Sequence, residues 1–257
     1  MSRLLKLIGI FAAIVAASAI GRLTDIHSAS SLGSETAPRQ HTTSTPSVPS
    51  PSVSATYTQA EIDYFLEIAM GPEFPKSSSE SKIRKWQGDI NIQYSGAPTS
   101  QDLATLESVV RELNTLTNGE IHLQLVNHNP NITIHFAPLS QFAQLEPGYQ
   151  PGNYGYFWDR WDENNTLNHA NVLVTTNKVT QKERSHLIRE ELTQSLGLMQ
   201  DSYKYPDSMF YQPWTDPTEY SAMDRVLIRM LYSPQVKAGM TKAQVLDAIK
   251  SNHLASG

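Results

Sequence analysis

The chain has 257 residues, of which 39% are hydrophobic, so it holds enough apolar material for one sizeable core. A formal net charge of -5 and a pI near 5.9 provide no basic field for phosphates, and we expect no nucleic-acid partner. The absence of cysteine excludes disulfides, thiolate metal ligands and a cysteine nucleophile. We therefore expect one folded domain that is stabilised by packing alone.

Residues 1–22 are typical of a signal peptide or an N-terminal membrane anchor. The uncharged run Leu7–Gly21 would span only about 22 Å as a helix, whereas a hydrocarbon core is roughly 30 Å thick. The small residues at 17–19, Ala-Ser-Ala, suit a signal peptidase. The alternative is an uncleaved anchor whose flanking Lys6 and Arg22 extend to the two membrane interfaces.

Residues 23–56 form a linker that is nearly all Ser, Thr, Pro and Ala between positions 28 and 56. Such a composition cannot bury enough apolar surface to offset its ordering entropy, so we expect a disordered tether. A tethered domain at residues 57–257 predicts an exported bacterial protein, which would lie in the periplasm, on the outer face of the membrane or outside the cell. The membrane would be a partner through the N-terminus only if the leader is not cleaved.

Hydrophobic periodicity predicts the elements of this domain in chain order. A capping box of Thr58 and Glu61 opens the first helix, and alternation or helical spacing indicates the others. They are strand 90–94, helix 99–117, strands 121–125 and 132–136, an aromatic edge segment 154–161, strand 171–176, and helices 181–196, 219–232 and 241–250. This order predicts an α/β (α+β) fold in which helices cover a twisted mixed sheet.

The helix near residue 190 carries a pair of glutamates that needs an explanation. Glu190 and Gln194 share one helical face, while Glu191 falls on the arc that faces the core. A buried carboxylate requires a cation, a metal, hydrogen-bond donors or a proton. The alternative is a solvated glutamate pair on a surface helix, which is common. Gly197 is placed to end the helix.

This segment resembles the active helix of the metzincin zinc metallopeptidases, H-E-x-x-H-x-x-G-x-x-H. The resemblance implies a zincin-like fold over roughly residues 60–240, with an active-type helix at 181–197. It also implies a Met-turn near Met209, within the segment Tyr-Pro-Asp-Ser-Met-Phe-Tyr.

The resemblance also assigns roles to residues of this helix. Glu191 would be the general base, and the metal ligands would be Glu190, Gln194 and either Gln200 or Asp201. The glutamate and the glycine of the motif are present, whereas every histidine of the motif is replaced.

The chain is also similar to an uncharacterised bacterial domain family of envelope lipoproteins that is grouped with metallopeptidases by fold and has no assigned activity. The similar stretches are EELTQSLGL, SMFY and MDRVLIRMLYSPQVKAGM, the last at 223–240. This family implies no function, and a chain without cysteine cannot carry its lipidated N-terminus.

The candidate ligands are poor ligands for zinc, which favours imidazole and thiolate. Carboxylate and amide oxygens suit calcium, magnesium or manganese better, although those ions usually require more carboxylates. A shifted site that uses His186 with Glu190, four residues apart, is a further alternative. The cofactor therefore stays open, with a divalent metal as the candidate and zinc not expected.

An aromatic stretch supplies a candidate partner surface, because Tyr156, Trp158 and Trp161 could line a groove for a peptide or a glycan. Equally, these side chains could simply cover an exposed edge strand.

Two functions follow from these patterns. The first is a non-peptidase binding domain whose partner is an envelope protein, a peptide or a glycan. The second is a metal-dependent hydrolase or peptidase with oxygen ligands, in which Glu191 deprotonates a bound water.

Overall fold

The computed structural model describes residues 57–71 and 81–254. The predicted signal or anchor at 1–22 and the whole of the predicted linker at 23–56 lie outside the described residues. Within the described ranges, no helix combines the length and the apolar character needed to cross a membrane.

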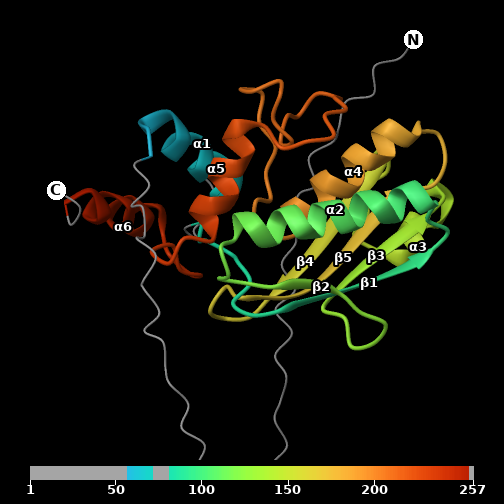
Figure 1. The fold of residues 1–257 in the computed structure, drawn as a ribbon, viewed down its shortest axis with the longest axis horizontal. Helices are drawn as coiled ribbons and strands as arrows, with labels where there is room; N and C mark the ends of the chain where they lie inside the picture. Colours follow the sequence, from blue (N-terminus) through green and yellow to red (C-terminus); the bar gives the residue numbers. More distant parts are fainter. Residues whose placement is uncertain (1–56, 72–80, 255–257) are drawn as a thin grey trace, which may run out of the picture.

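A five-stranded sheet forms the centre of the domain, with the strand order β2-β1-β3-β5-β4 (Figure 1). The first four strands in that order run parallel, and β4 is antiparallel to β5 at the edge. The strands are β1 Ile90–Gly96, β2 Leu123–Leu125, β3 Ile132–Ala137, β4 Gly155–Trp161 and β5 Leu167–Thr175. The predicted mixed sheet with covering helices is confirmed, and its edge strand precedes the last strand as the metzincin resemblance implied.

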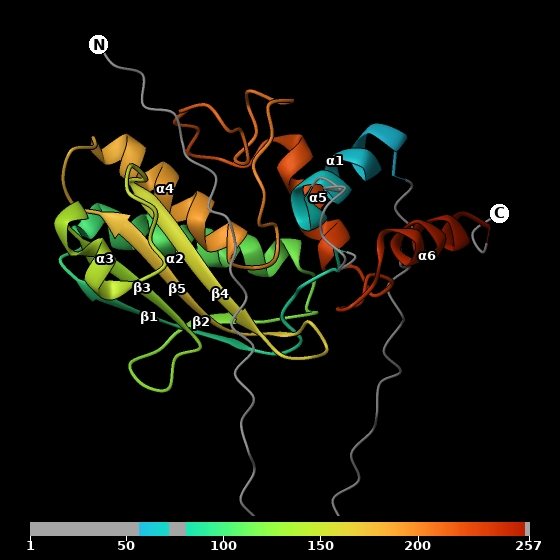
Figure 2. The same cartoon turned by 180° about the vertical axis from the view of Figure 1, so that it is seen from behind.

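The helices divide into two groups around this sheet. Helices α2, Ser100–Leu116, and α4, Gln181–Gln194, cover one face of the sheet, whereas α1, α5 and α6 lie at one end (Figures 1 and 2). The latter three are Gln59–Met70, Ala222–Leu231 and Lys242–Leu254, and the short elements η1, Leu139–Gln141, and α3, Phe142–Leu145, follow β3.

Five of the described helices begin with a capping box, in which the residue before the helix and the third residue of the helix each cap the other's backbone N–H through their side chains. The box predicted at Thr58 and Glu61 is confirmed, and the same arrangement opens α2, α4, α5 and α6. Each box satisfies two donors that a helix start otherwise leaves unpaired. These caps define where the covering helices begin.

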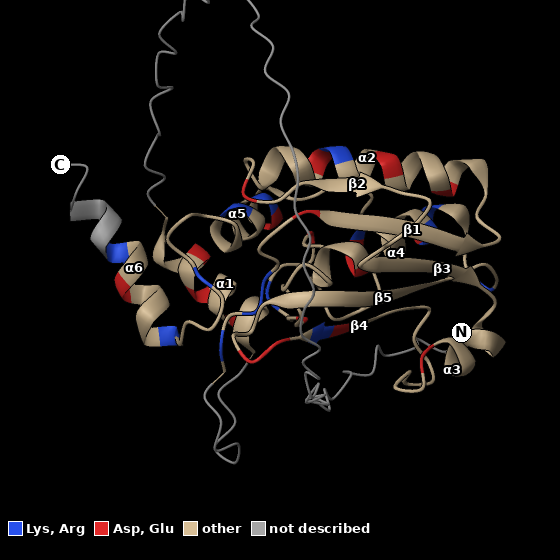
Figure 3. Cartoon of the chain, turned by 90° about the horizontal axis from the view of Figure 1, so that it is seen from below, with Lys and Arg blue, Asp and Glu red and all other residues tan. Residues whose placement is uncertain are grey.

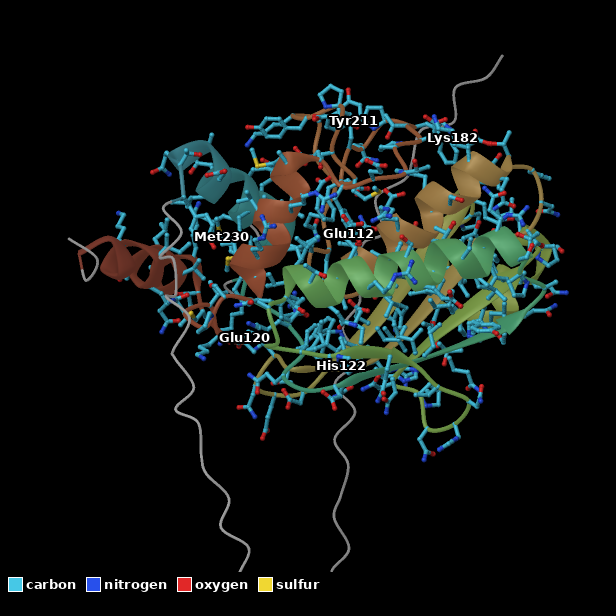
Figure 4. The ribbon with its side chains drawn as sticks, in the orientation of Figure 1. Glu112, Glu120, His122, Lys182, Tyr211 and Met230 are labelled. Carbon is cyan, nitrogen blue, oxygen red and sulfur yellow. The ribbon has the colours of Figure 1, made fainter. Side chains whose placement is uncertain are left out.

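Alternation along the strands decides which side of the sheet is packed. Ile90 and Ile92 of β1, with Ile132 and Ile134 of β3, are fully buried beneath the helices. At the rim of this core, Glu112 of α2 bridges Arg189 of α4 and Arg225 of α5 (Figure 4). The helix layer is therefore joined by charge as well as by apolar packing.

Several boundaries differ from those expected from the sequence. The aromatic segment is a full strand, and β5 begins at Leu167 rather than at 171. Its first residues, Leu-Asn-His-Ala, have two polar residues between two buried apolar ones, so they lack the alternation that indicates a strand. Helix α4 ends at Gln194, and the chain turns through Gly197.

Candidate binding site around helix α4

Helix α4 is buried along nearly its whole length, although its sequence is rich in polar and charged residues. Every residue from Arg184 to Gln194 is buried. Glu190 is 1% exposed and Glu191 is 6% exposed, so neither glutamate is solvated. A polar helix can be buried on all sides only if its side chains find partners inside the protein.

Those partners come from the neighbouring helix α2. The Arg184 guanidinium donates to Asp102 over 3.1 Å, and Gln181 donates to the other oxygen of the same carboxylate over 2.6 Å. Burial would raise the pKa of Asp102, but these bonds and those from Thr99 outweigh burial and lower it. Arg189 forms the ion pair with Glu112 and lies over the ring of Tyr220, 4.5 Å from its centroid.

Glu190 contacts His186 one turn earlier, which is the pair of residues predicted for the alternative, shifted metal site. The carboxylate Oε2 lies 3.2 Å from Nε2 of the imidazole, and both side chains are buried. These two atoms do not have the geometry of a hydrogen bond. Nδ1 of His186 lies 2.8 Å from the Pro217 carbonyl, which can only accept, so Nδ1 carries a proton. The first predicted ligand therefore already faces an internal partner.

The structure brings two further candidate ligands together. The side-chain nitrogen of Gln194 donates to Asp201 Oδ1 over 2.7 Å, which joins the end of α4 to the chain that returns past it. Gln200 instead donates its backbone N–H to Ile68 of α1, and its side chain packs against Gly71. The residues aligned with the second and third ligands thus bind each other or the protein.

Glu191, the candidate general base, lies directly against the edge strand. A Cβ atom on Gly155 of β4 would lie 2.3 Å from Oε1 of Glu191, so only glycine admits the carboxylate here. Burial, followed by the charges of Glu146 and Glu191, raises the pKa of Tyr156 to about 12. Glu191 is therefore a packed carboxylate at the junction of α4 and β4.

The turn at Met209 is held by buried hydrogen bonds. Met209 is fully buried, and its N–H donates to the Asp224 carboxylate over 3.0 Å. The Ser208 hydroxyl donates to the other oxygen of Asp224 over 2.6 Å and accepts from Tyr64 over 3.0 Å. Because Asp224 also caps α5, one buried carboxylate ties the turn to two helices.

A metal does not fit this donor set. Among residues 57–71 and 81–254, no three His, Asp or Glu side chains gather closely enough to hold an ion. The oxygen of Asp201 that faces Gln194 accepts from an amide, and Glu190 faces an imidazole. Binding a metal at Asp201 would require the contact with Gln194 to break, and the Gln194 amide donor would then be buried without this acceptor.

The three groove aromatics do not share one face. Tyr156 and Trp158 belong to a small cluster on the side of the sheet opposite α4, where the segment after α3 covers them. Tyr156 donates its hydroxyl to the Gly148 carbonyl over 2.7 Å. Trp161 points to the helix side. The Arg84 guanidinium stacks on its ring, with Arg84 Cζ 4.1 Å from the ring centroid.

Two residues of this region were not singled out from the sequence. Gly155 admits Glu191 to β4, and nothing in the Gly-Tyr-Phe-Trp pattern indicates that close approach. Asp224 could have been found, because Ser221 and Asp224 have the spacing of a capping box. Its second role under Met209 depends on tertiary contacts alone.

Comparison with known proteins gives a family but no activity. Two solved structures of myroilysin match, with TM-scores of 0.37 and 0.39 and identities of 13% and 12%. They cover 58% and 62% of this chain and 82% and 88% of the myroilysin chains. Curated proteins show no match. One family model matches residues 59–251, and the chain therefore belongs to the family described as Protein of unknown function (DUF2927).

Proposed function

We propose that this protein is an exported envelope protein whose domain binds a partner and has no peptidase activity. The single observation that carries the proposal is the hydrogen bond from Gln194 to Asp201, because it occupies the positions where a metallopeptidase would hold its metal. The contact between His186 and Glu190 extends the same pattern to the first ligand position.

The energetics favour the internal contacts over a metal. Separating Gln194 from Asp201 would leave a buried amide donor unpaired, at a cost of about 1–3 kcal/mol. Oxygen ligands hold Ca²⁺ or Mn²⁺ well only when several carboxylates converge. Asp201 and Glu190 each face a partner of their own and do not converge on one point, so they offer no such group of carboxylates to an ion.

The partner surface that we favour is the edge strand β4 beside Glu191. An edge strand can pair with an extended segment through its backbone, and side chains alternate along such a segment. We therefore propose a peptide segment of another envelope protein as the partner, rather than a glycan. Strand β4 has Arg160 exposed, which favours an acidic segment.

Elemental analysis of the purified full chain after dialysis tests the absence of a metal centre. The expected result is far less than one metal ion per chain, both for the wild type and for Gln194→Ala. Near-stoichiometric metal in the wild type, lost in Gln194→Ala, would establish the metal-dependent hydrolase instead. Asp216→Ala, at an exposed ion pair with Lys182, is the matched control and should match the wild type.

Mass analysis of the native N-terminus tests the export proposal. A chain that begins at Ile20 would be a secreted protein, and an intact Met1 in the membrane fraction would be a tethered one. An intact chain found in the cytosol would contradict both forms of the proposal.

A further inference from the structure

The sheet face that points away from α2 and α4 is a second region of polar chemistry. Strands β1, β3 and β5 carry no Lys, Arg, Asp or Glu, as the uniform colour of these strands in Figure 3 shows. Most of their outward positions instead hold serine, threonine, asparagine, glutamine and histidine, while Ala137 and Leu173 on the same face belong to the aromatic cluster of Tyr156. This face is therefore largely polar but carries no charged side chain along three adjacent strands.

A serine and a histidine meet on this face. The parallel register of β1 and β3 places Ser95 directly beside His135, and Ser95 Oγ lies 2.8 Å from His135 Nδ1. Ser95 is exposed, whereas His135 is half-buried. A hydroxyl within hydrogen-bond reach of an imidazole is the first requirement for an activated serine nucleophile.

A third and a fourth residue orient the imidazole. Glu146 is 6% exposed, and its Oε2 accepts from the side-chain nitrogen of Asn171 over 3.1 Å. This bond fixes the amide nitrogen toward Glu146. Burial lowers the pKa values of His135 and His169, and the neighbouring Asn171 side chain opposes that effect at both rings.

His135 accepts the Ser95 hydroxyl in the neutral tautomer that carries its proton on Nε2. In that tautomer Nδ1 has a lone pair that faces the Ser95 hydroxyl, 2.8 Å away. Burial lowers the pKa of His135, although the bond to Asn171 and the charge of Glu146 oppose that effect. The ring is therefore neutral at neutral pH.

We propose that Ser95 is a nucleophile and His135 its general base, in a second site that cleaves small uncharged carboxylic esters. Ser95 Oγ attacks the ester carbonyl carbon while its proton passes to Nδ1 of His135. The bond from the carbonyl carbon to the leaving oxygen breaks, and that oxygen takes the proton to leave as an alcohol. Water then attacks the Ser95 ester, returns the proton to Ser95 through His135, and releases the acid.

The environment of the pair selects the substrate class. Because strands β1, β3 and β5 have no charged side chain, a charged substrate would find no counter-ion on the three strands around Ser95. Asn171 is a positioning residue, since it acts only through His135. Glu146 acts one step further away, by fixing the orientation of Asn171.

Labelling of the full chain with a fluorophosphonate probe tests this site, with the modified residue located by mass spectrometry. The expected adduct is on Ser95, it is absent in Ser95→Ala, and the labelling rate falls at least tenfold in His135→Gln. Ser100→Ala removes an exposed serine that follows the same strand and should label as the wild type does.

The pH profile of labelling separates activation from simple exposure. In the wild type the rate should rise as His135 loses its proton and reach a plateau by neutral pH, whereas His135→Gln should lack this rise. Because Ser95 is exposed, Ser95→Ala should keep the wild-type melting temperature. No adduct on Ser95, or an equal labelling rate in His135→Gln, would overturn the proposal.

Discussion

The two faces of the sheet treat polar residues in opposite ways. On the helix side, the side chains of α4 are buried, and many of them meet internal partners such as Asp102, Glu112 and Asp201, although Arg184 Nε, His186 Nε2 and Arg189 Nε have no hydrogen-bond partner among the described residues. On the open side, Glu146 contacts Asn171, and His135 contacts the exposed hydroxyl of Ser95. The contrast teaches that the helix with the motif of a catalytic centre keeps its polar groups buried inside the protein, while the region without a motif exposes a group that is available for chemistry.

The largest effect is expected at Asp224, which holds the Met209 turn from beneath. Asp224→Ala would leave the Ser208 hydroxyl and the Met209 N–H buried without an acceptor, so we expect unfolding to cost about 3–5 kcal/mol less. Urea denaturation measures this change. A loss of less than about 1 kcal/mol would mean that the turn is not held by this carboxylate.

Gly155 tests how closely α4 approaches the edge strand. In Gly155→Ala the new methyl group would overlap Glu191, and we expect a loss of about 1–3 kcal/mol in the free energy of unfolding. Gly88→Ala is the matched control, because nothing lies within 4 Å of a Cβ at that position. The double variant Gly155→Ala, Glu191→Ala should recover part of the loss. No recovery would show that the destabilisation by Gly155→Ala does not come from overlap with Glu191.

The buried pair of Asp102 and Arg184 predicts a pH dependence. The folded-state pKa of Asp102 is below its usual value of 3.8, so its contribution to stability is present above about that pH and is lost as pH falls through the folded pKa. The difference in unfolding free energy between wild type and Asp102→Asn should be constant above pH 5 and shrink in acid. A difference that grows in acid would reverse the sign and contradict the assignment.

The smallest effect is expected at the exposed ion pair between Lys182 and Asp216, 2.9 Å apart. Asp216→Asn should change the free energy of unfolding by less than about 0.5 kcal/mol, because solvent screens exposed charges. Thermal unfolding at low and high salt measures this change. A larger loss of unfolding free energy that salt does not reduce would contradict this, because it would show that the exposed Lys182–Asp216 pair stabilises α4 as much as the buried contacts do.

Local patterns predicted much of the fold. The capping spacing of Thr58 and Glu61, the alternation in β1 and β3, and the inward direction of Glu191 on the helical wheel all follow from short-range geometry. The sequence could not reveal the partners of α4, because Asp102 and Glu112 lie about 80 residues away along the chain.

The open-face site was missed for the same physical reason. His135 and His169 have no ligand spacing along the chain, and they lie on two adjacent strands, β3 and β5. The alternation of β3 placed His135 on the outward face, but the pairing of Ser95 with His135 depends on strand register. Register between parallel strands follows from the whole packed sheet and not from either strand alone.

Thermal unfolding of the full chain with zinc, with manganese and with EDTA tests the central claim most directly, since a metal that binds only the folded state must stabilise it. A site with a Kd of about 1 µM, in about 100 µM metal, would add about 2.7 kcal/mol and raise Tm by roughly 5 °C or more. The internal hydrogen bond between Gln194 and Asp201 predicts the same Tm in all three conditions. A rise of that size with either metal, abolished in Gln194→Ala but retained in Asp216→Ala, would contradict it.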